Sequence, residues 1–328
     1  MRKNSPIIAM VFVFVIIMTG CASFGSQEKV IVDIFWDTAL LLNVNRMTDD
    51  GLAKSWARVS PDGRRLLYSE STRNVPRTVY SNLYDYWNIM LLRDVNSPAK
   101  TPMLDEHAYA ASWYGNSSDF VYAVIEGGGS RIVRSAITGG GRTYISRYPL
   151  GRGDTRPVIR GDDILCDAEI NGRRQILRMK DTGMEVTVLG EGHSPFWHPN
   201  PRINKFLFIR NGNIFEMDLA TIQVTQLHSD PNYECAMPSY SPNGEWIIFQ
   251  KGVILKSSGG QAGFFSGASS QTQSRWQIFI IKADGSGLAA LTVPQVDSWS
   301  PSWDLNNLIY FVSSASGSTE VYRAQINF

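Results

Sequence analysis

The stretch Val59-Ser60-Pro61-Asp62-Gly63-Arg64-Arg65-Leu66-Leu67-Tyr68 joins a bulky residue, a tight-turn sequence and an apolar run. It recurs as Tyr240-Ser241-Pro242-Asn243-Gly244-Glu245-Trp246-Ile247-Ile248-Phe249. Pro presets φ, Asp or Asn bonds its own backbone, and Gly accepts the left-handed conformation, so each copy predicts a β-hairpin. Weaker copies begin at four more bulky residues, which are Trp113, Ile159, Trp197 and Trp303. Six copies predict repeated units that stack on their neighbours to bury their faces.

The segments around these copies are short, apolar and rich in β-branched and aromatic residues. They include residues 120–125, 131–136, 176–179, 206–209, 214–217, 278–282 and 308–312. No stretch after residue 30 has a helical period over several turns. A second turn, such as Ala283-Asp284-Gly285, leads to a fourth strand in the repeat. Four antiparallel strands per repeat predict an all-β chain, a six-bladed β-propeller.

The two hairpin sequences, together with Lys282-Ala283-Asp284-Gly285-Ser286-Gly287-Leu288-Ala289-Ala290-Leu291-Thr292, resemble the repeat of TolB-type (WD40-like) six-bladed β-propellers. The resemblance covers residues 39–328 and is weakest in the third repeat, where the segment after Ile159 is shortened. TolB itself carries an α/β domain before its propeller, and residues 22–38 are too few to build one. The resemblance therefore implies the fold, while TolB's own task in envelope constriction does not carry over.

The two ends of the propeller segment predict how the ring closes. Residues 320–326 resemble a third strand, with no fourth strand after them. Residues 39–48 end in Met47-Thr48, which matches Leu291-Thr292 at the end of a fourth strand. We therefore expect this N-terminal strand to complete the sixth blade.

The first twenty residues predict export from the cytoplasm. Arg2 and Lys3 precede an apolar run over residues 6–18, which is short for a membrane-spanning helix and ends in Met18-Thr19-Gly20-Cys21. This resembles a bacterial lipoprotein signal; an ordinary cleaved signal and an uncleaved anchor helix are the alternatives. The resemblance implies a signal peptide over 1–20, lipidation of Cys21 and a tether over 21–38. Ala22 favours the outer membrane, because Asp at this position is associated with inner-membrane retention.

Charge and cysteine content exclude some functions. The chain has 31 Lys and Arg and 30 Asp and Glu, and loss of residues 1–20 removes Arg2 and Lys3, leaving 29 against 30. A net charge near −1 provides no basic field for nucleic acid. Cys166 and Cys235 lie in the third and fifth repeats, too far apart for a disulfide, so we expect two unpaired thiols.

Catalytic signals are sparse. There is no Gly-x-Ser-x-Gly sequence, and we expect no hydrolase domain of the kind that follows similar propellers in prolyl oligopeptidases. Of the four histidines, His107, His193, His198 and His228, the second and third have an odd spacing, which on a regular strand places them on opposite faces. A metal site would need histidines from several blades, as in some pectate-degrading lyases with propeller folds.

Two long insertions fall between the second and third strands of their repeats, at residues 70–87 and 257–274. These insertions and the connections between blades emerge on one face of a propeller, so this face is the candidate binding face. The insertions contribute Tyr80, Tyr84, Tyr86, Trp87, Phe264 and Phe265, and the connections contribute Asp49, Asp50, His107, Asp154, Arg156, His193, Glu234, Asp297 and Trp299. Aromatic and polar groups together suit protein recognition. Alternatively, the aromatic residues before the third strand pack between blades, and the Gly/Ser-rich insertion is disordered.

These features predict a non-catalytic, lipid-anchored envelope protein whose propeller binds other proteins. The expected partners are envelope proteins, including peptidoglycan-associated ones; we expect a monomer, no cofactor, no metal, and a location on the periplasmic side of the outer membrane. One alternative is a propeller that binds a glycan or a small ligand. The other is an enzyme similar to metal-dependent polysaccharide lyases.

Overall fold

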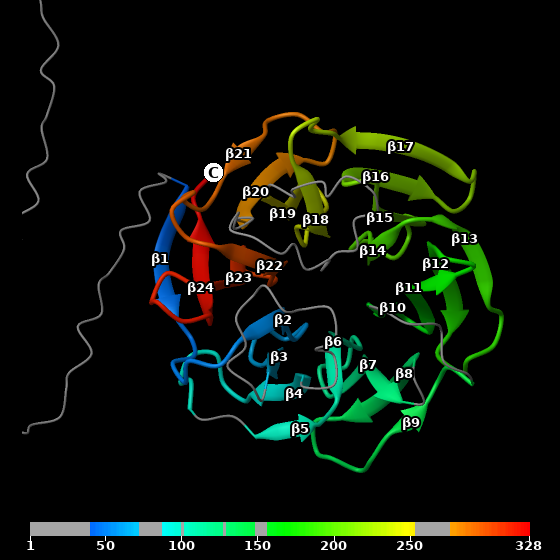
Figure 1. The fold of residues 1–328 in the computed structure, drawn as a ribbon, viewed down its shortest axis with the longest axis horizontal. Helices are drawn as coiled ribbons and strands as arrows, with labels where there is room; N and C mark the ends of the chain where they lie inside the picture. Colours follow the sequence, from blue (N-terminus) through cyan, green and yellow to red (C-terminus); the bar gives the residue numbers. More distant parts are fainter. Residues whose placement is uncertain (1–39, 72–86, 100–101, 127–128, 148–155, 253–275) are drawn as a thin grey trace, which may run out of the picture. The chain divides into compact units, whose positions relative to one another are not determined.

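The computed structural model describes residues 40–71, 87–99, 102–126, 129–147, 156–252 and 276–328. In these residues, strands form six four-stranded antiparallel sheets, which are arranged as the blades of a propeller (Figure 1). The all-β, six-bladed propeller expected from the repeat is confirmed. No helix long and apolar enough to cross a bilayer occurs in the described ranges.

Each blade uses consecutive strands except the last, which combines both ends of the propeller. Blade 1 contains β2 (Lys54–Val59), β3 (Leu66–Ser71), β4 (Trp87–Leu92) and β5 (Met103–Asp105); blade 2 contains β6 (Ala108–Trp113), β7 (Asp119–Glu126), β8 (Gly129–Ala136) and β9 (Thr143–Tyr144); blade 3 contains β10 (Val158–Arg160), β11 (Asp163–Ile170), β12 (Arg173–Lys180) and β13 (Thr187–Glu191); blade 4 contains β14 (His193–Trp197), β15 (Lys205–Arg210), β16 (Asn213–Asp218) and β17 (Gln223–His228); blade 5 contains β18 (Glu234–Tyr240), β19 (Trp246–Gly252), β20 (Trp276–Lys282) and β21 (Ala289–Ala290); blade 6 contains β22 (Ser298–Trp303), β23 (Leu308–Ser313), β24 (Glu320–Ile326) and β1 (Leu41–Arg46).

The hairpin predicted from the opening sequence joins β2 to β3. Gly63 has a φ of 71° and its N–H donates to the Ser60 carbonyl at 2.8 Å. The Ser60 hydroxyl accepts from the Arg65 N–H at 2.9 Å, which adds a second hydrogen bond across the same loop. The copy in blade 5 repeats this geometry, with Gly244 N–H donating to the Ser241 carbonyl at 2.9 Å. The turn chemistry thus produces the same corner in both blades.

The ring closes through β1, as predicted. This strand pairs antiparallel with β24, and Leu41 lies opposite Ile326 while Arg46 lies opposite Tyr322. β24 in turn pairs with β23, so the fourth strand of blade 6 comes from the start of the propeller (Figure 1). Leu41 and Ile326 are each 5% exposed and belong to the apolar core of this blade.

The first strand of each blade lies nearest the centre of the ring (Figure 1). Pairing between first and second strands shifts register in five blades, where one residue bulges and takes a left-handed backbone conformation. We call these residues the bulge positions, namely Trp56, Ala110, Ser194, Met237 and Ser300, with φ between 50° and 55°. Because a bulge turns the strand, it redirects the side chains that follow toward the centre.

Both remaining cysteines are free and buried. Burial raises the pKa of the Cys166 thiol well above its usual range, and that of Cys235 to about 12. The prediction of two unpaired thiols is confirmed, and both behave as small apolar side chains of the core.

Candidate binding site in the central channel

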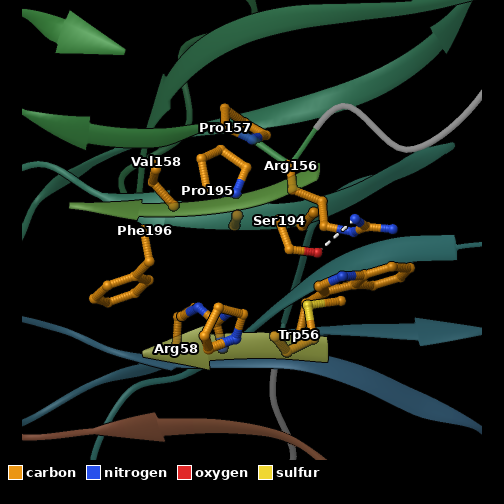
Figure 2. Close-up of a pocket in the computed structure, with 12 residues that line it drawn as sticks. Trp56, Arg58, Arg156, Pro157, Val158, Ser194, Pro195 and Phe196 are labelled. Atoms are coloured by element: carbon orange, nitrogen blue, oxygen red, sulfur yellow. Dashed lines mark hydrogen bonds between the residues drawn. The ribbon is translucent and has the colours of Figure 1, made fainter. Parts of the chain in front are cut away.

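A pocket lies at the centre of the ring, between the first strands of blades 1 to 5. We call it the channel pocket; it is lined by Trp56, Arg58, Ala110, Ala111, Arg156, Pro157, Val158, Ser194, Pro195, Phe196, Met237 and Pro238 (Figure 2). Its volume is about 340 Å³, including space open to solvent. In Figure 2, Arg156 and Trp56 lie toward one end of the pocket, and Arg58 and Phe196 lie toward the other.

Arg58 follows the bulge of β2 and brings an uncompensated positive charge to the pocket. Its Nη1 donates to the Ala57 carbonyl at 2.9 Å and to the Pro301 carbonyl at 3.4 Å. No carboxylate in the described part of the chain lies within ion-pair distance of its guanidinium. Burial lowers the pKa of Arg58 to about 10, so it stays charged at neutral pH. A desolvated guanidinium held only by carbonyl groups attracts an anion.

Arg156 is 4% exposed and is fixed by neighbouring strands. Its Nη1 donates to Ser194 Oγ at 2.7 Å and lies 3.5 Å from Asp167 Oδ2. Asp167 is fully buried and also pairs with Arg174. Asp167 therefore holds two guanidinium groups in place beside the pocket.

His193 contributes no charge to the site. Burial holds the pKa of this imidazole well below its usual range, and the neighbouring Arg156 and Arg174 lower it further. Its Nδ1 lies 3.0 Å from Ser194 Oγ and 3.4 Å from Arg156 Nη1. The neutral ring therefore lies beside Arg156 and adds no charge to the pocket.

Trp56 supplies a further hydrogen-bond donor. The residue is 3% exposed, and its ring packs against Trp87 and Tyr109 at centroid distances of 5.4 Å. Its Nε1–H is buried without a hydrogen-bond partner among the described residues. A buried indole N–H usually has an acceptor, so this unpaired donor can bond to an acceptor group that enters the pocket.

A second charged group, the closure cluster, lies where β1 leads into β2: Thr48, Asp50, Lys54, Glu70 and Glu320. The Lys54 ammonium is fully buried and lies 3.2 Å from Glu320 and 3.6 Å from Glu70, while Asp50 also pairs with it. Glu320 Oε2 accepts from Thr48 Oγ1 at 2.7 Å, and its Oε1 accepts from the Gly51 N–H at 2.9 Å.

The carboxyls of the closure cluster titrate differently. Burial, together with the neighbouring Asp50, raises the pKa of Glu70 to about 7. Burial also acts to raise the pKa of Asp50, but its hydrogen bonds with Lys54 and Glu70 outweigh this effect. The pKa of Asp50 is therefore lowered. The contacts of the closure cluster join β24 of blade 6 and the segment after β1 to β2 and β3 of blade 1, so we assign this cluster to ring closure.

The predicted face residues that the structure describes divide between packing and polar roles. Trp87 begins β4, is 5% exposed and packs on Trp56, in line with the packing alternative. Trp299 is 8% exposed, and Asp297 Oδ1 accepts from the Trp276 N–H at 2.7 Å. His107 is exposed and Glu234 is partly buried at the starts of their blades. Cys21, Tyr80, Tyr84, Tyr86, Asp154, Phe264 and Phe265 lie outside the described residues.

The odd spacing of His193 and His198 does not by itself place their side chains on opposite faces of a strand. The bulge at Ser194 lies between them, so the side chains do not simply alternate along this strand. His198 Nδ1 accepts from the Asn200 N–H at 3.2 Å, and its ring lies 4.9 Å from that of Tyr240. In the described residues, no group of three or more His, Cys, Asp or Glu is arranged to hold a metal ion.

Among the pocket residues, the sequence analysis named Arg156 alone. A signal for the others is present, because the residue two positions before each bulky anchor is Ala or Pro in all six repeats: Ala57, Ala111, Pro157, Pro195, Pro238 and Pro301. Each of these residues follows an inner-strand position equivalent to the bulge. Four of them line the channel pocket, and the carbonyl groups of the other two, Ala57 and Pro301, accept hydrogen bonds from Arg58. This small-residue position locates the pocket wall.

Comparison with known proteins supports the fold. No family model and no curated protein sequence matches the chain. Among solved structures, TolB from Acinetobacter baumannii is similar with a TM-score of 0.55 and 14% identity over 82% of this chain; the match spans 66% of that protein, just under two thirds.

Two enzymes share the architecture to a similar degree. A gluconolactonase from Xanthomonas campestris has a TM-score of 0.56 and 11% identity, covering 87% of this chain and 89% of its own. An oligogalacturonate lyase from Vibrio parahaemolyticus has a TM-score of 0.53 and 13% identity, covering 88% and 94%. At such identities the likeness defines the propeller fold, which hosts both binding proteins and enzymes.

Proposed function

We propose that this chain is a non-catalytic, lipid-anchored propeller that binds other proteins of the cell envelope through its central channel. The observation that carries the proposal is the channel pocket, where strands of five blades converge on two guanidinium groups and an orphaned indole N–H. A rigid ring that presents fixed donors beside apolar walls suits recognition of a partner segment. Lipidation at Cys21 would hold the propeller on the periplasmic side of the outer membrane.

The acid–base groups near the pocket also favour binding over catalysis. His193 is neutral and bonded within the scaffold, and Asp167 neutralises arginines. A general base needs access to substrate, but Asp167 is fully buried, and burial holds the pKa of His193 well below its usual range. In this proposal, the lyase and the lactonase therefore share the fold with this chain and not its function. A glycan or small-ligand binder is the second candidate, and the positive pocket would favour an acidic ligand for it.

The test is photocrosslinking in the cells that naturally produce the protein. A benzophenone amino acid replaces Phe196, which lines the pocket, or Met184, which is 51% exposed in the β12–β13 turn and serves as the control. We expect a specific protein adduct from position 196, none from position 184, and loss of the adduct in a Cys21→Ala variant. Absence of a protein adduct from position 196 would refute the proposed function.

A further inference from the structure

We propose that the channel pocket is a carboxylate-binding site, and that it receives an acidic side chain from an extended segment of the partner protein. This inference rests on the proposed function and specifies the chemistry of the same site. It starts from three donors that line one cavity: the guanidinium groups of Arg58 and Arg156 and the Nε1–H of Trp56. All three donate and none accepts, so the complementary group must be an acceptor.

The charges favour a singly charged anion. Arg58 has no carboxylate partner in the described ranges, and Arg156 shares Asp167 with Arg174. The Arg58 guanidinium thus supplies one positive charge, while the Asp167 carboxylate lies 3.5 Å from Arg156 Nη1 and would repel a doubly charged phosphate. A carboxylate provides one negative charge and two oxygens that match guanidinium geometry.

The walls favour a peptide over a sugar acid. Besides the donors and Ser194, the lining consists of apolar groups, among them Phe196, Met237 and the prolines. Ser194 Oγ already accepts from Arg156 at 2.7 Å. A sugar ring would bring several hydroxyls next to apolar walls, leaving them without partners at a cost of about 1–3 kcal/mol each. Apolar residues beside an acidic one suit the same walls.

The experiment uses the full chain, immobilised in detergent, and blocked pentapeptide libraries. One library has Glu fixed at its centre, one has Gln, and one has phosphoserine; digalacturonate is the fourth probe. We expect the Glu library to be retained about 10-fold or more over the Gln library, the range for a charge-assisted bond in a desolvated site. Equal retention of the two libraries would overturn the proposal, as would preferential retention of phosphoserine or of digalacturonate.

Variants assign the effect to the pocket. Arg58→Gln is expected to abolish the Glu preference, and Trp56→Phe, which keeps the ring and removes only the N–H, to reduce it by about 3- to 10-fold. Arg173→Gln, at a guanidinium side chain that is 67% exposed, is the control and should leave the preference unchanged. Urea midpoints of all variants identify loss of folding. A Glu preference that survives both pocket variants, when these are folded, would contradict the assignment.

The two proposals can fail separately. A protein adduct at position 196 that Arg58→Gln leaves unchanged would keep the scaffold function and refute the carboxylate site. A Glu preference without any cellular protein adduct would keep the site and refute the scaffold.

Discussion

At the residue scale, the inner strands keep five non-glycine residues in a left-handed conformation, which costs about 1–2 kcal/mol each. Neighbouring side chains hold these backbones in place. Ser69 Oγ accepts from the Ala110 N–H at 3.2 Å, Gln250 Oε1 accepts from the Ser300 N–H at 2.8 Å, and Ser300 Oγ accepts from the Trp56 N–H at 3.2 Å. Each bond crosses from one blade to the next, so the strain is tied to blade packing.

Replacing Ala110 by Gly tests this strain. Ala110 has a φ of 55° and is 4% exposed, while its neighbour Ala111 is 3% exposed with an ordinary φ. Ala110→Gly and Ala111→Gly each remove one buried methyl group, so the two variants differ mainly in backbone strain. We expect Ala110→Gly to be more stable than Ala111→Gly by about 1–2 kcal/mol in urea unfolding. Equal losses would show that the bulge is unstrained.

The closure cluster predicts a pH dependence. The pKa of Glu70 is raised to about 7, so the stability provided by its protonated form is complete below its ordinary value near 4.5 and is lost as pH rises through 7. Glu70→Gln mimics the protonated form. We expect this variant to gain about 1–3 kcal/mol relative to the natural protein between pH 5 and pH 8, measured by urea unfolding.

Glu320→Gln is the matched control in the same cluster. Its carboxylate accepts from Thr48 and Gly51 and faces the buried Lys54, so the amide should cost about 3–5 kcal/mol at both pH values. If the stability of Glu70→Gln relative to the natural protein were the same at pH 5 and pH 8, this would contradict the raised pKa of Glu70.

At the element scale, the turn between the outer strands of one blade rests on the blade before it. The Gly183 turn in blade 3 touches the backbone of Ile145 in blade 2, and the Gly285 turn in blade 5 touches the backbone of Leu227 in blade 4. A Cβ at Gly183 would lie 2.0 Å from the Ile145 oxygen, and one at Gly285 would lie 2.3 Å from the Leu227 oxygen. These glycines set the distance between neighbouring blades.

Gly183→Ala should therefore separate blades 2 and 3. Gly139 provides the control, because it has a similar φ of 84° but nothing within 4 Å of an added Cβ. We expect Gly139→Ala to cost about 1–2 kcal/mol from backbone strain alone, and Gly183→Ala to cost at least about 3 kcal/mol. Thermal unfolding of the two variants measures the difference, and similar losses would argue against a tight blade contact.

Local chemistry explains which elements could be predicted from the sequence. The hairpin after Val59, the all-β fold and the pairing of residues 39–48 with the last strand depend on alternation and turn residues within short segments. The channel pocket combines Trp56 and Arg58 of blade 1 with Arg156, which lies just before the first strand of blade 3, and the bulges interrupt the alternation of side chains. Neither the pocket nor the bulges therefore have a strong local sequence pattern. Of the aromatic residues in the predicted insertions, Tyr80, Tyr84, Tyr86, Phe264 and Phe265 lie outside the described residues, and their role remains a prediction.

At the scale of the whole molecule, one strand pair holds the ring together. β1 and β24 bring Leu41 opposite Ile326, and the closure cluster adds buried charge contacts beside them. In a propeller each blade is supported by both neighbours, so an open ring exposes two blade faces and a sheet edge.

Adjacent leucines on β1 test the importance of closure. Leu41 is 5% exposed in the blade 6 core, and Leu42 is 43% exposed. We expect Leu41→Ala to cost about 2–4 kcal/mol and Leu42→Ala less than about 1 kcal/mol in urea unfolding. Deletion of residues 39–48 should prevent cooperative folding altogether, and a fully stable deletion variant would refute closure by this strand.

The same pairing makes the order of synthesis matter. Its partners are nearly 300 residues apart, so β1 leaves the ribosome early and waits unpaired until β24 is available. Contacts of such long sequence separation fold slowly, because the intervening loop must first lose its freedom. A chain interrupted before residue 320 would keep an open edge that proteases and aggregating strands can reach. We therefore expect a chain in which β24 has paired with β1 to resist proteolysis better than a chain in which this edge is open.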